Sequence, residues 1–211
     1  MAREYVLQPY RESIKLQIDY EAELNDAQRS AVTALPGPAL VIAGAGSGKT
    51  RTLTYRVAYL LEQGVPADRI LLLTFTNKAA NEMKSRIQEL LQSPLADLWC
   101  GTFHGLFHRM LKMHWEEAGL IKSFSILDGD DQNRIIKRVI KKMNLDEATW
   151  QARQTQWFIN KQKDEGRRVA KLPNKATYVE EKMADIYLEY QKTCEEEGVV
   201  DFAEILLRSY E

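Results

Sequence analysis

A glycine-rich stretch of eight residues constrains the fold of this 211-residue chain more than any other feature. It follows an apolar run, residues 39–43, and precedes a stretch of helical composition that extends to about residue 63. Its residues are Ala43, Gly44, Ala45, Gly46, Ser47, Gly48, Lys49 and Thr50. Glycines in such a turn let backbone N–H groups point inward around a phosphate, and the N-terminus of the following helix adds positive partial charge. The sequence therefore predicts a buried strand, a phosphate-binding loop and a helix, in that order.

The end of this loop indicates which ligand it binds. Lys49 is long enough to reach the β- and γ-phosphates of a nucleotide, and the Thr50 hydroxyl is suited to ligate Mg²⁺. The strict motif begins with glycine where this chain has Ala43, but Gly48-Lys49-Thr50 is intact. We predict that nucleotide and Mg²⁺ bind here; the alternative is a glycine-rich turn without a ligand. Kinases, transporters, GTPases and helicases share this loop, so the loop alone does not identify the reaction.

Apolar runs alternate with amphipathic stretches over residues 38–102. Three runs, 39–43, 70–75 and 98–102, have the length of buried strands, and the stretch that begins at Asn77 has a capping residue and one apolar face. The order strand–helix–strand–helix–strand is typical of a parallel sheet with crossover helices, and it predicts an α/β fold.

The regions on either side follow other patterns. Apolar and polar residues alternate over 14–20, which predicts a short strand, and Asn25 or Asp26 caps a helix that ends before the turn at 36–38. After about residue 107 nearly every stretch has helical periodicity. The expected helices include one capped by Asp128, two over residues 154–164 and 176–197, and a last one capped by Asp201.

Charge is distributed unevenly along the chain, although 29 basic and 30 acidic residues sum to a net charge of −1. Residues 109–175 have 15 basic and 9 acidic side chains, a net charge of +6, whereas residues 176–211 have 3 and 10, a net charge of −7. The middle segment is therefore the candidate surface for a polyanion, and solvated helix faces are the alternative.

Composition also bears on location. The two cysteines cannot form a disulfide-rich scaffold, which favours a reducing compartment. Residues 1–20 mix charged with apolar side chains, and no apolar run reaches 18 residues, so we expect neither a signal peptide nor a membrane span. We predict a cytoplasmic protein without a membrane partner. The three histidines lack acidic or cysteine neighbours at metal-ligand spacing, so we expect no histidine metal site.

Several segments resemble the superfamily 1 DNA helicases of the UvrD/Rep/PcrA type. Residues 24–28 are similar to the glutamine motif of these helicases, residues 74–83 to a motif that follows the phosphate loop, and residues 101–105 to the short motif after it. The quoted segments are Leu24-Asn25-Asp26-Ala27-Gln28, Thr74-Phe75-Thr76-Asn77-Lys78-Ala79-Ala80-Asn81-Glu82-Met83, Gly101-Thr102-Phe103-His104-Gly105, Ile126-Leu127-Asp128, Gln162-Lys163-Asp164-Glu165-Gly166 and Val200-Asp201-Phe202-Ala203-Glu204-Ile205-Leu206-Leu207. The resemblance covers about residues 24–211.

The resemblance implies an ATP-dependent helicase that moves 3′→5′ along single-stranded DNA. Junctions of single and double strands are the implied substrates, and repair proteins are implied partners. The implied fold is a P-loop RecA-like parallel-sheet domain, present in part, with an inserted and mostly helical accessory subdomain. The implied divisions are an N-terminal extension at 1–23, the ATP-binding domain at 24–108, the insertion at 109–197 and a return to the first domain at 198–211.

Two residues outside the loop are candidates for nucleotide binding. A glutamine amide can pair with adenine N6 and N7, and the resemblance implies this role for Gln28; a surface glutamine on a capped helix is the alternative. Arg51 directly follows the loop and could stack near the base, contact a phosphate or lie solvated on its helix. The resemblance names ATP as the nucleotide.

Candidate DNA contacts follow two predicted strands, at the sheet edge where ligands of open α/β sheets bind. An aromatic ring there can stack on a base, and hydroxyl, amide and ammonium groups can hold phosphates. The resemblance implies single-strand contacts by Phe75, Thr76, Asn77, Lys78, Thr102, Phe103 and His104. Without it, Phe75 would be assigned to the core, and His104 would be read as a packed or a surface residue.

A predicted helix after Asp128 has four cations on one face and apolar residues on the other. The cations are Arg134, Lys137, Arg138 and Lys141, and the apolar residues are Ile135, Ile136, Val139 and Ile140. Contact with the backbone of duplex DNA is one hypothesis, and a solvated face is the other.

One part of the expected machinery is absent from this sequence. An ATPase of this kind needs an acidic pair that holds Mg²⁺ and positions water, which these helicases have in a DExQ motif. No such segment occurs in residues 1–211, and the chain ends inside an apolar helical pattern. We therefore expect an N-terminal fragment of a helicase that binds nucleotide or DNA without efficient turnover.

Overall fold

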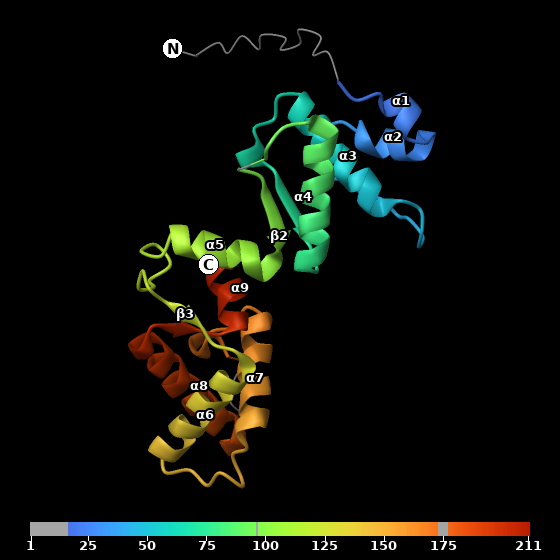
Figure 1. The fold of residues 1–211 in the computed structure, drawn as a ribbon. Helices are drawn as coiled ribbons and strands as arrows, with labels where there is room; N and C mark the ends of the chain where they lie inside the picture. The colour runs from blue at the N-terminus through green and yellow to red at the C-terminus, as the bar shows by residue number, and fades with distance from the viewer. Residues whose placement is uncertain (1–16, 96, 173–176) are drawn as a thin grey trace, which may run out of the picture. The chain divides into compact units, whose positions relative to one another are not determined.

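The computed structural model describes residues 17–95, 97–172 and 177–211. The chain divides into two compact units, Met1–Thr102 and Phe103–Glu211 (Figure 1). In the described residues, both units are rich in helix and contain a small parallel sheet, which agrees with the α/β prediction in its coarse form. No described helix is both long and apolar enough to span a membrane.

The first unit alternates helices with the two strands of its sheet. Its elements are α1 (Tyr20–Glu23), α2 (Asp26–Val32), α3 (Lys49–Glu62), the 3-10 helix η1 (Ala67–Arg69), β1 (Leu71–Thr74), α4 (Asn77–Leu91) and β2 (Trp99–Thr102). β1 and β2 run parallel, with Leu71 opposite Trp99 and Thr74 opposite Thr102, so α4 is the crossover between them. The parallel strand–helix–strand unit predicted for residues 70–102 is confirmed.

The core of the first unit lies where α3 and α4 pack on the sheet. Its buried residues are Val57, Ile70, Leu72, Met83, Ile87, Leu95 and Leu98. The predicted apolar face of α4 is confirmed, but the cap is one residue earlier than predicted. Thr76, and not Asn77, caps the helix, because Thr76 Oγ1 accepts a hydrogen bond from the Ala79 N–H at 3.2 Å.

The strand predicted over residues 39–43 is wrong for this structure. These residues belong to no strand, and Leu40 and Ile42 are 87% and 89% exposed. A strand exists only when a neighbour accepts and donates its backbone hydrogen bonds. Among the described residues, β1 and β2 pair only with each other, so this apolar run has no partner. The predicted five-element alternation therefore begins with the helix α3.

The strand predicted over residues 14–20 is also not present where the structure describes the chain. Residues 14–16 lie outside the described part, and Tyr20 is the first residue of α1. Asp19 explains the difference, because its carboxylate accepts a hydrogen bond from the Glu21 N–H at 3.1 Å and so caps a helix.

The second unit is mostly helical, as predicted for the chain beyond residue 107. Its elements are α5 (Phe103–Met113), β3 (Ser125–Ile126), α6 (Gly129–Lys142), α7 (Ala152–Asp164), the 3-10 helix η2 (Val169–Lys171), α8 (Tyr178–Glu197), β4 (Val199–Val200) and α9 (Phe202–Tyr210). Asp128 and Asp201 cap α6 and α9, as predicted. The parallel ladder between β3 and β4 was not predicted, because two residues per strand show no periodicity.

The main core of the second unit is enclosed by α6, α7 and α8. Its fully buried members include Ile136, Ile140, Ile159, Ile186 and Tyr187. The apolar face predicted for α6 is therefore confirmed as a core face.

A cluster of buried charges links α7 to α9. Lys163 Nζ lies 2.6 Å from Asp201 Oδ2 and 2.9 Å from Glu204 Oε2, and the three side chains are 1–2% exposed. The Tyr190 hydroxyl donates to Asp201 Oδ2 at 2.7 Å. Burial acts to raise the pKa of Glu204, but Lys163 and two arginines, Arg168 and Arg208, outweigh it and lower this pKa to about 2. These charges are paired and hydrogen-bonded, as buried ions must be in a stable fold.

Candidate nucleotide-binding site

Two glycines shape the candidate phosphate-binding loop. Gly46 and Gly48 have φ values of 76° and 82°, in the left-handed region that glycine tolerates best. Within the turn, the Ser47 hydroxyl donates to the Gly44 carbonyl at 2.8 Å. Gly48 is the N-cap residue of α3, and no described side chain caps this helix start. Its first N–H groups therefore have no side-chain acceptor, and such groups favour an anion.

Lys49 folds back over the same loop. Its Nζ donates to the Gly44 carbonyl at 2.7 Å and to the Ala43 carbonyl at 3.2 Å. The side chains of Lys49 and Thr50 are exposed to solvent. A solute can therefore reach the ammonium and hydroxyl groups that the sequence assigns to phosphate and Mg²⁺.

Gln28 comes from α2 and contacts the loop directly. Its Nε2 donates to the Ser47 carbonyl at 3.0 Å, while its Oε1 accepts from the Asn25 N–H at 3.3 Å. Asn25 and Gln28 form the capping box that starts α2, which fixes where the amide lies. A Cβ at Gly48 would be 2.7 Å from Gln28 Nε2, so a side chain there would displace the amide from its present position. The structure thus brings Gln28 and the loop together.

Arg51 is held by two residues that sequence reasoning did not select. The Nη2 atom of Arg51 donates to Glu23 Oε2 at 2.6 Å and to the Glu23 carbonyl at 2.9 Å. The guanidinium carbon lies 4.8 Å from the centroid of the Tyr55 ring. Burial and a hydrogen bond to Glu23 raise the pKa of Tyr55. No sequence signal identifies Glu23, because its partner is 28 positions away and belongs to another helix.

The ends of β1 and β2 bring together the candidate DNA contacts of the first unit. Thr74 and Thr102 are opposite each other in the ladder, and Thr102 Oγ1 donates to Asn77 Oδ1 at 3.5 Å. The Phe75 side chain is 96% exposed, so its assignment to the core is excluded in this structure. The other candidates at this sheet edge are the helix-capping Thr76 and the exposed Lys78.

The last two candidate DNA contacts belong to the second unit. Phe103 is half exposed at the start of α5, and its ring centroid lies 6.0 Å from that of Phe107. The His104 ring makes an edge-to-face contact with Phe202 of α9 at 5.6 Å. Nearby, burial and Lys112 lower the pKa of His108. The described residues contain no group of three or more His, Cys, Asp or Glu that could hold a metal ion.

The cationic face of α6 is partly neutralised by its own unit. Arg134 pairs with Asp131 at 2.6 Å, and Arg138 pairs with Glu197 at 2.9 Å. Lys137 and Lys141 form no ion pair with another described residue.

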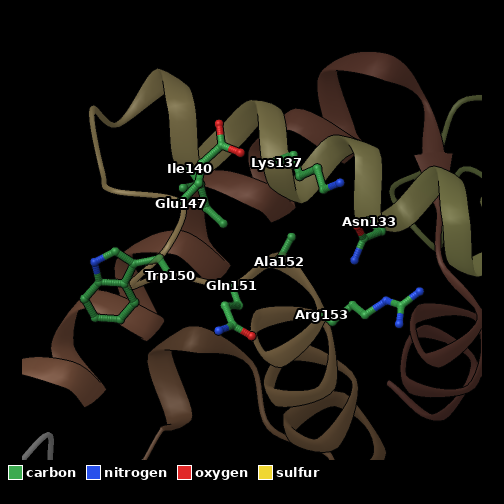
Figure 2. Close-up of a pocket in the computed structure, with 8 residues that line it drawn as sticks. All are labelled: Asn133, Lys137, Ile140, Glu147, Trp150, Gln151, Ala152 and Arg153. Carbon is green, nitrogen blue, oxygen red and sulfur yellow. The ribbon is translucent and has the colours of Figure 1, made fainter.

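Lys137 instead borders a pocket of about 240 Å³ between α6 and the start of α7. Figure 2 shows Lys137 and Arg153 extending from the two helices that border it. Its other lining residues are Asn133, Ile140, Glu147, Trp150, Gln151 and Ala152. The pocket therefore adds Arg153 to the cations that the sequence placed on this surface.

A glycine turn that opens an uncapped helix, with a glutamine amide bonded to it, has the form of a phosphate-binding loop in a mixed helix-and-sheet protein. The family model described as the UvrD/REP helicase N-terminal domain matches residues 24–211, and the chain belongs to this family.

Named relatives agree with this assignment. DNA helicase II of Salmonella typhimurium strain LT2 is 50% identical over 190 residues, and DNA helicase II of Escherichia coli strain K12 is 49% identical over 189 residues. Each match covers 89% of this chain and 26% of the relative. ATP-dependent DNA helicase PcrA of Bacillus subtilis strain 168 is 39% identical over 186 residues, which cover 87% of this chain and 25% of that protein. The chain spans about a quarter of the length of these relatives.

Proposed function

We propose that this chain is the ATP-binding portion of an ATP-dependent DNA helicase that moves 3′→5′ along single-stranded DNA. The hydrogen bond between Gln28 and the Ser47 carbonyl supports this most directly. It joins a side chain able to pair with adenine to a loop able to bind phosphates. The relatives named DNA helicase II and ATP-dependent DNA helicase PcrA support the same function.

ATP and Mg²⁺ fit the chemistry of this site. The glycine loop and the start of α3 provide N–H donors for phosphate oxygens, and the accessible ammonium of Lys49 provides a positive charge. Thr50 would ligate Mg²⁺ through its hydroxyl. Binding and hydrolysis of ATP would supply the free energy for movement, and Lys49 would donate to phosphate oxygens in place of its loop carbonyl acceptors.

The same chemistry limits what these 211 residues do alone. Efficient hydrolysis needs carboxylates that hold Mg²⁺ and position water, and the sequence has no DExQ segment. The chain itself therefore acts as a nucleotide- and DNA-binding module without efficient turnover.

The proposed architecture is a partial RecA-like P-loop domain with an inserted helical accessory subdomain. The parallel β1–α4–β2 unit supports the first part, and the helical core of α6, α7 and α8 supports the second. We assign the ATP-binding domain to 24–108, the insertion to 109–197 and the return to 198–211, with 1–23 as an extension. The compact units divide between Thr102 and Phe103, a few residues before the proposed insertion.

Single-stranded DNA is the proposed partner of the sheet edge that follows β1 and β2. The almost fully exposed ring of Phe75 is suited to stack on a base, and Thr76, Asn77, Lys78 and Thr102 offer polar groups beside it. Phe103 and His104 are proposed contacts on the second unit. Repair proteins as partners stay a prediction from the resemblance, and a cytoplasmic location stays a prediction from the composition.

Duplex DNA at a junction is the proposed partner of α6. Lys137 and Arg153 border one pocket and form no ion pair with another described residue, so they can contact phosphates without losing an existing partner.

Substituting both Lys137 and Arg153 with glutamine should lower the affinity for duplex DNA of any sequence and flatten the salt dependence of that affinity. Lys142→Gln is a matched control, because Lys142 is already paired with Glu189 at 2.6 Å. Unchanged binding by the double variant would contradict this role.

Calorimetry with ATP and Mg²⁺ tests the central proposal. The chain should bind ATP, Lys49→Ala should abolish binding, and single-stranded DNA should stimulate no robust hydrolysis. Retained binding in the Lys49→Ala variant would reject the loop as the nucleotide site. Robust turnover would show that the carboxylates needed for hydrolysis lie within residues 1–211.

A further inference from the structure

A carboxylate just outside the family match lies against the proposed nucleotide site. Glu23 is the last residue of α1, directly before the matched residues 24–211. Its Oε2 accepts hydrogen bonds from Arg51 Nη2 at 2.6 Å and from the Tyr55 hydroxyl at 3.0 Å. Its backbone carbonyl accepts from the same Arg51 nitrogen at 2.9 Å. The recognised motifs give Glu23 no role.

These contacts restrict the orientation of the Arg51 guanidinium. Arg51 and Glu23 are 45% and 51% exposed, and an exposed ion pair alone contributes little to stability. Here the carboxylate and carbonyl of Glu23 hold one guanidinium nitrogen, and the Tyr55 ring lies beside the guanidinium carbon. These contacts of Glu23 and Tyr55 therefore act through geometry, because they fix the planar guanidinium of Arg51, which would otherwise move freely.

Arg51 also borders the same glycine as Gln28. A Cβ placed at Gly48 would lie 2.7 Å from Gln28 Nε2 and 3.8 Å from Arg51 Cβ. Arg51 thus begins at the turn of α3 that the Gln28 amide contacts. Glu23 already matches its charge, which weakens its attraction for phosphate, whereas a guanidinium plane remains a good surface for an aromatic ring.

We propose that Glu23 is a positioning residue of the nucleotide site, which holds the Arg51 guanidinium beside Tyr55 so that Arg51 supports the base of the nucleotide and not its phosphates. This inference rests on the proposed function, since it requires a nucleotide at the loop. It gives the segment before the glutamine motif a part in binding.

Two probes separate support of the base from support of the phosphates. Calorimetry on the whole chain would compare ATP with inorganic tripolyphosphate, which has no base. Glu23→Gln should weaken ATP binding about three- to tenfold and change tripolyphosphate binding less than about twofold. Glu21→Gln is the matched control, because Glu21 lies on the same short helix but pairs with Arg29 at 2.9 Å, and it should change neither affinity. Equal weakening of both probes, or no weakening of ATP binding, would overturn the proposal.

A double-variant cycle distinguishes positioning from a purely structural role. In an Arg51→Ala background, Glu23→Gln should cause no further loss of ATP affinity, because Glu23 acts through Arg51. A full further loss would mean that Glu23 acts by another route. Tyr55→Phe offers a milder second variant, which keeps the ring and removes the hydrogen bond to Glu23; ATP affinity should fall by about twofold. Thermal unfolding of each variant identifies any loss of fold.

The role of Glu23 and the proposed nucleotide site can be rejected separately by these binding measurements. If the unsubstituted chain binds neither probe, both are rejected. If it binds ATP in a Lys49-dependent manner and Glu23→Gln changes nothing, only the role of Glu23 is rejected.

Discussion

The two units of this chain hold their charged residues in opposite ways. In the second unit, Lys163, Asp201 and Glu204 form ion pairs that are almost completely buried. In the first, Lys49 and Arg51 bond to a loop carbonyl and to a carboxylate at the surface. A buried charge that loses its partner stays desolvated, whereas an exposed one is solvated at once. The candidate ligand-binding side chains are therefore held by contacts at the surface, whereas the ion pairs that hold the fold are buried.

Apolar residues show the same contrast between buried and exposed positions. Ile159 in α7 of the second unit is completely buried, while Leu40 and Ile42 of the first unit are open to solvent. The free energy of unfolding should therefore depend much more strongly on Ile159 than on these exposed residues.

The largest expected effect is the loss of the buried ammonium. Lys163→Ala should lower the free energy of unfolding of the second unit by about 3–5 kcal/mol, because Asp201 would stay buried without a counter-charge, whereas Glu204 would keep Arg168 and Arg208. Urea unfolding followed by circular dichroism measures it. Arg134→Ala is the surface control, since its pair with Asp131 is exposed and should contribute less than about 1 kcal/mol. Similar losses of unfolding free energy in both variants would show that buried and exposed ion pairs contribute equally to stability.

Next in size is a pair of isoleucine truncations. Ile159→Ala should cost about 2–5 kcal/mol because it leaves a cavity in the core, and Ile42→Ala should change the free energy of unfolding by less than about 0.5 kcal/mol. Denaturant titrations of the two variants give the comparison directly. A large loss in Ile42→Ala would show that residues 39–43 pack against other parts of the chain in solution.

Acid should destabilise the second unit through Glu204. Its pKa in the folded chain is about 2, below the value of 4.5 for an unperturbed glutamate, so the unfolded chain binds more protons as the pH falls. The stability that Glu204 contributes is present above about pH 5 and is lost as the pH drops towards 2. Urea midpoints measured across this range should fall, and Glu204→Gln should flatten the curve. A midpoint independent of pH would contradict the assignment.

The smallest effect on stability should come from the candidate site itself. Lys49→Ala removes an exposed side chain bonded only to loop carbonyls, so the free energy of unfolding should change by less than about 0.5 kcal/mol. Nucleotide binding should nevertheless be lost. A thermal melt beside a binding titration checks both, and a marked drop in the melting temperature would place Lys49 among the residues that hold the fold.

Local patterns predicted much of this fold. The capping residues Asn25, Asp128 and Asp201 each start a helix as expected, because capping depends only on residues within one turn. The Gln28 contact with the loop agrees with the prediction that both belong to one site. The role of Gln28 in binding adenine stays a prediction.

Features that depend on distant partners were not predicted. The apolar run 39–43 has the composition of a strand, but a strand also needs a neighbour to pair with. The Glu23–Arg51 and Lys163–Asp201 pairs join residues 28 and 38 positions apart, a distance at which periodicity carries no information. The pairing of Arg138 with Glu197, 59 positions away, similarly could not be inferred from the cationic face alone.

The short ladder between β3 and β4 has a consequence for how this chain could be re-engineered. Two hydrogen bonds join the ends of the segment 127–198, which we call the excursion. They run from Ser125 N–H to the Gly198 carbonyl and from Leu127 N–H to the Val200 carbonyl. Paired strands lie about 5 Å apart, so the excursion leaves and returns at nearly the same point. It is therefore a natural graft site, where a short linker or a foreign domain could replace the excursion. Any such transplant removes Lys163 as well, so Asp201 would have to be exchanged for an uncharged residue in the same step, whereas Glu204 would keep its ion pair with Arg208.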